Sequence, residues 1–236
     1  MLYREVKRRL IVDIESGAVL PGGALPNESA LARRFEVSIG TVRRAVDELV
    51  ADHILVRQQG RGTFVRRLDK ARFMFQFFKI EGRDVAREFP QVRLHAFSKA
   101  RATPEEAHAL GLRGAASVFR IDNVLSLKGR AVIHDRIAID ADLFIGLTKQ
   151  TFGQRTGTIY ELYQTGFGVT VVDADEKVRA ELVDDVSAKI LGLPQGAPVL
   201  RIKRVAHTFD QRPVEFRISI VDSREFEYAS SMREQT

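Results

Sequence analysis

The chain contains an internal repeat, and this repeat constrains the fold more than any other feature of the sequence. A pattern of seven residues that begins at Ala107 returns 81 positions later, beginning at Ala188. Self-similarity at one fixed spacing indicates that a single structural unit is used twice. The first copy consists of Ala107, Leu110, Gly111, Leu112, Val118, Arg120 and Ile121, and the second of Ala188, Leu191, Gly192, Leu193, Val199, Arg201 and Ile202.

Each copy of the repeat predicts a helix followed by a β-hairpin. Residues 103–106 have the spacing of a capping box with proline in the first turn, and Asp184 or Asp185 is suited to begin the second helix. After each helix come a strand, a polar turn at residues 128–130 or 210–212, and a return strand. Two such units build an antiparallel sheet with helices packed on it, which is an α+β domain.

Residues 1–66 carry a different pattern, which predicts three short helices and a two-stranded hairpin. Asn27 and Ser38 are suited to begin the second and third helices. The polar, glycine-containing residues 58–62 separate two short apolar segments and predict the turn of the hairpin. The helices are predicted from three apolar stripes at helical spacing, namely Tyr3, Val6, Leu10 and Ile14; Leu31 and Phe35; and Val42, Ala45, Val46 and Leu49.

The positive charge of the chain is concentrated in this N-terminal part. The whole chain carries a net charge of +6, and residues 1–72 contain fourteen Lys and Arg against nine Asp and Glu. A basic excess on a small module indicates a polyanionic partner, because it attracts phosphates. We therefore predict a nucleic-acid-binding domain over residues 1–66, a polar linker over residues 67–72 and a second domain over residues 73–236.

Three separated segments, residues 25–32, 37–45 and 59–65, occur in the order found in a known DNA-binding module. In these segments the chain resembles the winged helix-turn-helix of GntR-family transcription regulators. The resemblance implies that the third helix reads the major groove and that the tip of the hairpin, the wing, enters the minor groove. The DNA-binding residues that it implies are Ser38, Thr41, Arg43, Arg44, Arg57, Arg61 and Gly62.

Three positions depart from the family pattern. Members of the family often have arginine where Ser29 and Ile39 stand here, and glycine where His53 follows the third helix. Each lost arginine removes a contact worth about 1–3 kcal/mol if it reads a base. We therefore expect an operator sequence that differs from those of the relatives.

The second domain is similar to the effector-binding UTRA domain of the HutC subfamily of GntR regulators, whose fold resembles chorismate lyase. The similarity is carried by residues 122–139, 157–162 and 212–216. It implies an antiparallel α+β domain that binds a small-molecule effector and forms a homodimer.

The pattern of the first hairpin and the resemblance together indicate an effector site. Strand alternation places Asn123 and Asp135 among apolar neighbours. A buried carboxylate needs a partner, so Asp135 either pairs within the protein or receives a donor from a ligand. The resemblance implies that the pocket is lined by Asp135, Thr158, Tyr160 and Glu215. Strand alternation adds Asn123 to this set. Arg217 is added because it is an arginine available to pair with an anionic ligand.

The class of effector follows from an arginine pair that is missing. Many relatives grip a sugar phosphate with an Arg-x-Arg pair, and Asn123 and Leu125 stand at those positions. Arg136 alternates away from the pocket, and Arg204 is expected to pair with Glu215. A phosphate thus lacks its bidentate clamp. We predict a small polar organic ligand, such as a carboxylate, in preference to a phosphosugar.

Several other classes of protein are disfavoured by the sequence. The chain has no cysteine, its histidines do not have metal-ligand spacing, and neither a phosphate-binding glycine loop nor a nucleophile elbow occurs. His134, opposite the pocket face, is expected at the surface. We find no export signal and no apolar run that would span a membrane, and we expect a cytoplasmic protein without metal or cofactor.

The expectation from the sequence is a ligand-responsive regulator of transcription that is not an enzyme. We expect a homodimer on double-stranded operator DNA, acting as a repressor that a small polar metabolite releases. Two alternatives stay open, an enzyme built on the second domain and a non-regulatory DNA-binding protein of the nucleoid.

Overall fold

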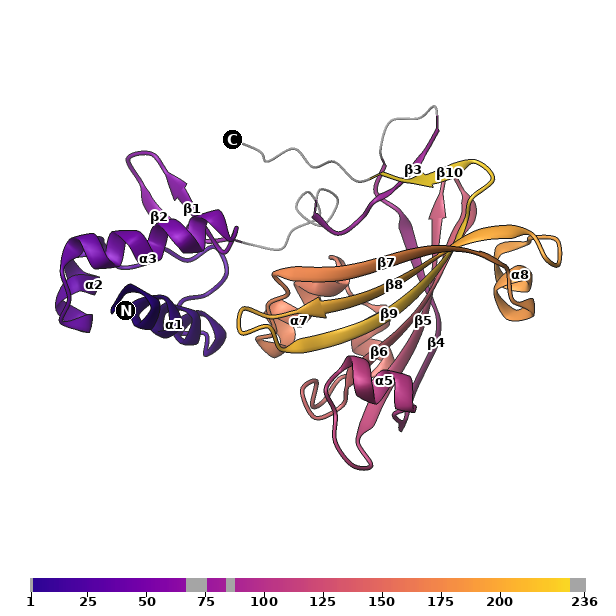
Figure 1. The fold of residues 1–236 in the computed structure, drawn as a ribbon, viewed down its shortest axis with the longest axis horizontal. Coiled ribbons are helices and arrows are strands. Elements are labelled where there is room, and N and C mark those ends of the chain that lie inside the picture. The colour runs from indigo at the N-terminus through magenta and orange to yellow at the C-terminus, as the bar shows by residue number, and fades with distance from the viewer. Residues whose placement is uncertain (1, 67–75, 84–87, 230–236) are drawn as a thin grey trace.

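The computed structural model describes residues 2–66, 76–83 and 88–229 (Figure 1). An N-terminal helical module with a hairpin stands beside a larger domain built on a twisted antiparallel sheet. This mixed architecture confirms the predicted α+β class. The predicted linker, residues 67–72, lies outside the described residues.

The N-terminal module consists of three helices followed by a two-stranded hairpin. The apolar stripes predicted from the sequence are buried together between the helices and form one core. Gly17, with φ at 77°, adopts the left-handed conformation that suits a glycine after a helix. The elements are α1 (Leu2–Glu15), α2 (Glu28–Phe35), α3 (Ile39–Ala51), β1 (Leu55–Gln58) and β2 (Gly62–Val65).

Side-chain caps begin both α2 and α3. The side chain of Asn27 accepts a hydrogen bond from the amide of Ala30 at 2.8 Å. Ser38 Oγ accepts one from the amide of Thr41 at 3.1 Å, which begins α3 where the sequence predicts it. Glu36 ends α2 in the left-handed conformation, so α3 starts only a few residues later at a sharp angle.

The larger domain contains one six-stranded antiparallel sheet with the order β4-β5-β6-β9-β8-β7. This order is symmetric about the contact between β6 and β9, and each half contains one copy of the sequence repeat. The predicted repeat is therefore confirmed as a repeat of structure. The strands are β4 (Gln91–Arg101), β5 (Ser117–Leu127), β6 (Arg130–Asp140), β7 (Asp173–Leu182), β8 (Pro198–His207) and β9 (Pro213–Asp222).

Helices cover both faces of this sheet. The helix of each repeat, α5 (Pro104–Ala109) or α8 (Asp185–Leu191), packs on one face through Leu110 or Leu191. The other face is covered by α6 (Lys149–Gly153) and α7 (Ile159–Phe167), which bury the main apolar core. A short ribbon of β3 (Ile80–Gly82) and β10 (Phe226–Tyr228) lies at one end of the domain (Figure 1).

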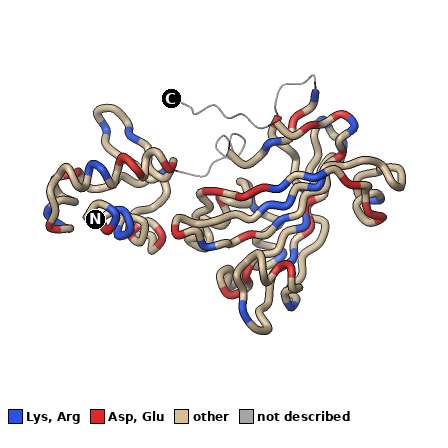
Figure 2. The backbone as a smooth tube through the Cα atoms, viewed as in Figure 1, with Lys and Arg blue, Asp and Glu red and all other residues tan. Residues whose placement is uncertain are grey.

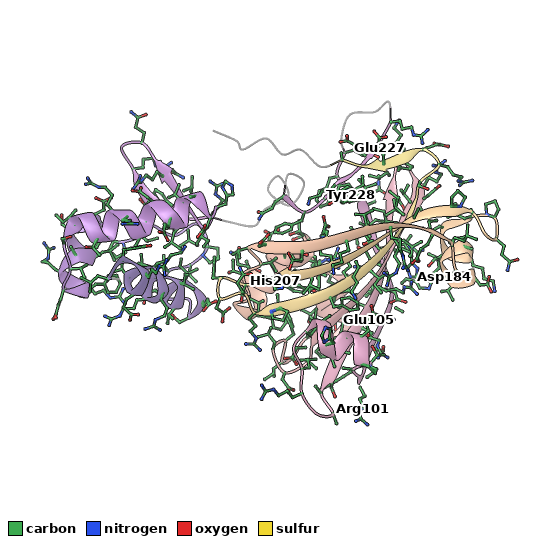
Figure 3. The ribbon with its side chains drawn as sticks, viewed as in Figure 1. Arg101, Glu105, Asp184, His207, Glu227 and Tyr228 are labelled. Atoms are coloured by element: carbon green, nitrogen blue, oxygen red, sulfur yellow. The ribbon has the colours of Figure 1, made fainter. Side chains whose placement is uncertain are left out.

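The expectation that His134 lies at the surface is wrong. Its side chain is fully buried, and its Nδ1 lies 3.0 Å from Ser187 Oγ on α8. The serine also donates to Asp184 Oδ2 at 3.0 Å, and Asp184 caps α8 (labelled in Figure 3). Strand alternation assigned His134 to the outer face correctly, but it does not reveal that α8 covers that face.

Candidate functional site

The first part of the candidate site is the exposed face at the beginning of α3. Ser38 caps the helix, and its Oγ lies 2.9 Å from Thr41 Oγ1. Arg43 and Arg44 are exposed one turn later. The amide groups at a helix N-terminus favour phosphate binding, and the basic side chains add to that attraction. The structure thus brings four of the predicted DNA-binding residues together on one surface.

Acidic residues hold two of the predicted arginines in place. Arg43 Nη2 lies 2.9 Å from Glu28 Oε2, and Arg57 Nη1 lies 2.6 Å from Asp47 Oδ1. Arg57 also approaches the second oxygen of Glu28 at 3.7 Å. Because all these groups are partly or largely exposed, water and salt screen each pair and its contribution to stability is small. DNA phosphates can therefore replace the carboxylates at small cost.

The wing presents a basic tip on a glycine turn. Gly60 and Gly62, with φ at 72° and 117°, adopt conformations that other residues rarely take. Arg61 is exposed between them, with its guanidinium carbon 5.8 Å from the centre of the Phe64 ring. The guanidinium of Arg44 lies 4.1 Å from the Tyr3 ring, so it stacks on α1 rather than pairing with an acid.

The second part of the candidate site lies on the sheet face that α7 covers. Asn123 and Asp135 are directly opposite each other on β5 and β6, and Asp135 is opposite Ser219 on β9. Arg217 lies two positions before Ser219 on β9, so both side chains are on the same face. Figure 2 shows both blue and red segments on the sheet of this domain. The predicted residues of the second domain are therefore neighbours in space.

Arg217 is the centre of a buried ion network. Its Nη1 donates to Asp135 Oδ2 at 3.0 Å, while Nε and Nη2 donate to the two oxygens of Glu215 at 2.9 and 3.0 Å. Ser219 Oγ donates to the other oxygen of Asp135 at 2.5 Å. Burial lowers the pKa of Arg217, but the two carboxylates outweigh it and raise that pKa well above its ordinary value.

Two tyrosines of α7 complete the coordination of Glu215. The hydroxyl groups of Tyr160 and Tyr163 donate to its carboxylate at 3.1 and 2.9 Å. Burial, together with the negative charge of Glu215, raises the pKa of Tyr160 to about 12. Both tyrosines are therefore protonated donors at neutral pH. The carboxylate of Glu215 receives four hydrogen bonds and is fully buried.

A second ion cluster lies beside the first and corrects one expectation. Arg204 does not pair with Glu215; its Nη2 lies 2.6 Å from Glu176 Oε1. Glu176 on β7 is directly opposite Arg204 on β8, whereas Glu215 is already occupied by Arg217. Lys79 Nζ binds Glu176 Oε2 at 2.9 Å, and Tyr228 at the end of β10 (labelled in Figure 3) donates to the same oxygen.

Two small cavities adjoin the Arg217 network. The cavity toward β7, of about 30 Å³, is lined by the second ion cluster. The cavity toward β4, of about 40 Å³, is lined by Asn123, Asp135, Thr158 and Arg217. We call this second cavity the candidate effector pocket. Tyr160 and Glu215 do not line it within the described part of the chain, but lie behind Arg217 and hold it.

Arg155 also lines the candidate effector pocket, and the sequence did not single it out. Its Nη1 donates to the carbonyl of Phe152 at 2.6 Å, and its guanidinium stacks on the Phe152 ring at 4.2 Å. No carboxylate of the described residues forms an ion pair with it. Burial lowers the pKa of Arg155, and the charge of Arg217 adds to this effect. The one feature of the sequence that could have indicated Arg155 was its position, just before residues 157–162, which resemble the UTRA domain.

The described residues contain neither a candidate membrane-spanning helix nor a candidate metal site. None of the described helices is both long and apolar enough to cross a membrane. Within residues 2–66, 76–83 and 88–229, no group of three or more histidine and acidic side chains is arranged to hold a metal ion.

Comparisons with known proteins match the two domains separately. Residues 2–65 match the model of bacterial regulatory proteins of the gntR family, and residues 86–227 match that of the UTRA domain. The histidine utilization repressor of Pseudomonas aeruginosa is 31% identical over 86% of this chain and 80% of that protein. The transcriptional repressor NagR of Bacillus subtilis is 27% identical over 87% of this chain and 84% of its own length.

A solved structure shows the same fold for the larger domain. The ligand-binding domain of a GntR-family regulator from Bordetella bronchiseptica superposes with a TM-score of 0.63 at 28% identity, covering 66% of this chain and 96% of that one. Since the matched UTRA domain alone spans more than half of the sequence, the chain belongs to the GntR family of bacterial regulatory proteins, in the HutC-like group that carries a UTRA domain.

Proposed function

We propose that this protein is a repressor of transcription that leaves its operator when a small polar metabolite binds the second domain. The observation that carries the proposal is the pairing of two sites in one chain. An exposed helix N-terminus with a basic wing faces outward in the N-terminal module. A pocket lined by buried polar side chains lies in the other domain. The two relatives described above are both named repressors, which supports this sign of regulation.

The domain limits and the assembly belong to the same proposal. The DNA-binding domain spans residues 1–66, the linker residues 67–72 and the effector-binding domain residues 73–236. The protein acts in the cytoplasm as a homodimer on a near-palindromic site, because two-fold symmetry presents two α3 helices to successive major grooves. The DNA-binding residues are those implied by the family resemblance.

The contact between the two domains offers a route for the response. Phe209, in the turn between β8 and β9, and Val172 pack against the core of the N-terminal module. Figure 1 shows this turn pointing toward α1, and His207 before it is labelled in Figure 3. The strand that leaves the turn, β9, carries Arg217. A ligand that shifts Arg217 therefore acts on the strand that touches the DNA-binding module.

The response is a shift between two populations of the dimer. Ligand favours a state whose two α3 helices are spaced incorrectly for the operator, which requires different ligand affinities in the two states. Catalysis is not part of the proposal. The three buried carboxylates near the pocket, Asp135, Glu176 and Glu215, are all paired with arginines, so none is a free general base.

The test begins with selection of random oligonucleotides by the purified full-length chain. The proposal predicts an enriched, near-palindromic sequence, and release of that DNA by one member of a metabolite panel. Failure to enrich any sequence at low ionic strength would contradict the DNA-binding role. An enriched site with no releasing metabolite and measurable turnover of one panel member would favour an enzyme.

A further inference from the structure

We infer that the candidate effector pocket binds a small monocarboxylate that also carries a hydrogen-bond donor, with Arg155 holding the carboxylate and Asn123 accepting from the donor. This inference rests on the proposed function in one respect, namely that the pocket lined by Asn123 and Arg217 is the effector site. It adds the chemical class of the ligand and a binding residue, Arg155, that the family resemblance did not supply.

The first step is a charge balance over the buried sheet face. Three cations and three carboxylates lie on or beside this face, and each cation has a carboxylate within 3.0 Å. Buried charges are tolerated when they are paired in this way. The protein therefore neutralises these six groups itself. The cations are Lys79, Arg204 and Arg217, and the carboxylates are Asp135, Glu176 and Glu215.

Arg155 is a fourth cation and has no such partner. It is partly buried at the edge of the same pocket, and no described carboxylate lies within 4.0 Å of it. Only its Nη1 is used, by the carbonyl of Phe152, so Nε and Nη2 make no hydrogen bond with a described residue. Two adjacent guanidinium donors match the two oxygens of a carboxylate in a bidentate pair. An anionic ligand would therefore supply the carboxylate partner that Arg155 does not find among the described residues.

The count of unpaired charge separates a carboxylate from a phosphate monoester. One unmatched guanidinium neutralises one negative charge, which is the charge of a carboxylate. A phosphate monoester carries between one and two charges at neutral pH, and its second charge would lie beside Asp135 without a free cation. Arg217 does not supply that cation, because its single positive charge is already paired with two carboxylates, those of Asp135 and Glu215.

Asn123 adds the second requirement. Its side chain is only 3% exposed, and its Oδ1 is buried without a hydrogen-bond partner in the described structure. An unpartnered buried acceptor is costly, so a ligand that donates to it gains affinity. Hydroxyl, amine and ring N–H groups are such donors. Since Asn123 and Arg155 line the same small pocket, the carboxylate and the donor belong to one molecule.

The experiment uses three matched sets of probes on the full-length chain, measured by thermal shift and titration calorimetry. The first set contains monocarboxylates with a donor, such as lactate, glycerate, gluconate and the amino acids that have no acidic side chain. The second contains the corresponding primary amides, and the third phosphate monoesters such as glycerol 3-phosphate and glucose 6-phosphate. We expect binding by at least one monocarboxylate, and at least tenfold weaker binding by its amide and by the phosphate esters.

Two variants then assign the role of Arg155. Arg155→Met keeps the packing on Phe152 and should weaken the bound monocarboxylate at least tenfold, while the melting temperature without ligand stays within about one degree. Arg155→Lys should recover part of the affinity, because lysine restores the positive charge but not the two adjacent donors of the guanidinium. A merely structural arginine would instead lower the melting temperature in Arg155→Met and leave the affinity unchanged.

Three results would overturn the inference: phosphate esters that bind as tightly as monocarboxylates, full affinity in Arg155→Met, or no binding by any monocarboxylate. Operator binding, measured in parallel by mobility shift, separates these failures from failure of the proposed function. If a monocarboxylate binds through Arg155 but leaves operator affinity unchanged, the effector role is wrong and the ligand class stands.

Discussion

Glu28 restrains the DNA-binding arginines, and replacing it by glutamine should strengthen operator binding. In the free protein its carboxylate pairs with Arg43 at 2.9 Å and approaches Arg57 at 3.7 Å. DNA phosphates have to displace this carboxylate before they reach either guanidinium. Glutamine keeps the length of the side chain and removes its charge.

The magnitude follows from the exposure of the groups. The side chains of Arg43, Arg57 and Glu28 are 60%, 47% and 31% exposed, so water screens each pair and each pair is weak. Release of the closer pair, together with one fewer repulsion against phosphate, should raise operator affinity about two- to tenfold. Loss of the acidic group in the first turn of α2 should cost about 0.3–1 kcal/mol of stability.

Fluorescence anisotropy with the selected operator provides the assay, and Glu5→Gln provides a matched control. Glu5 also pairs with two arginines, Arg8 at 2.7 Å and Arg9 at 2.9 Å, but on α1. The substitution Glu5→Gln removes the same charge at a place away from α3 and the wing, so we expect operator affinity to change less than twofold. Equal gains in both variants would mean that only net charge matters. A loss of affinity in Glu28→Gln would show that Glu28 positions the arginines for DNA.

Three further perturbations test other parts of the structure. Arg43→Ala should weaken operator binding and reduce the salt slope of binding by about one unit, measured as affinity against salt concentration; an unchanged slope would remove Arg43 from the phosphate contacts. Asp135→Asn should cost about 2 kcal/mol in urea unfolding through its bond to Arg217 and abolish release by the effector while operator binding persists; normal release would refute its assignment. Although burial opposes the shift, the hydrogen bond from Arg120 lowers the pKa of Glu106. The stability from this pair is therefore complete above the ordinary pKa of 4.5 and is lost as the pH falls through the lower pKa of the folded protein. Glu106→Gln should flatten that part of the profile of unfolding free energy against pH, and an unaltered profile would contradict a stabilising role of this pair.

Local patterns predicted much of the fold because they act within one element or one repeat. The stripe on α3 and the cap at Ser38 depend only on neighbours in sequence. The 81-residue repeat predicted two helix-hairpin units, and the sheet is symmetric about β6 and β9 for that reason. Alternation likewise placed Asn123 and Asp135 on one face, directly opposite each other.

What the sequence did not reveal depends on contacts between distant elements. The burial of His134 follows from α8, which is 53 residues away from it at Ser187. The partner of Arg204 was predicted wrongly, because the pairing of β7 with β8 brings Glu176 opposite it. The unpaired state of Arg155 emerges only when the neighbouring carboxylates are seen to be occupied. Alternation assigns a residue to a face but does not say which charges meet there.

The central claim is that the N-terminal module of each subunit places α3 in a major groove of the operator. Hydroxyl-radical footprinting of the full-length chain on the selected operator tests this claim most directly. The account predicts two symmetric protected segments whose centres are separated by one or more helical turns of about 10 base pairs. Protection of a single segment, or uniform protection of any DNA, would contradict it.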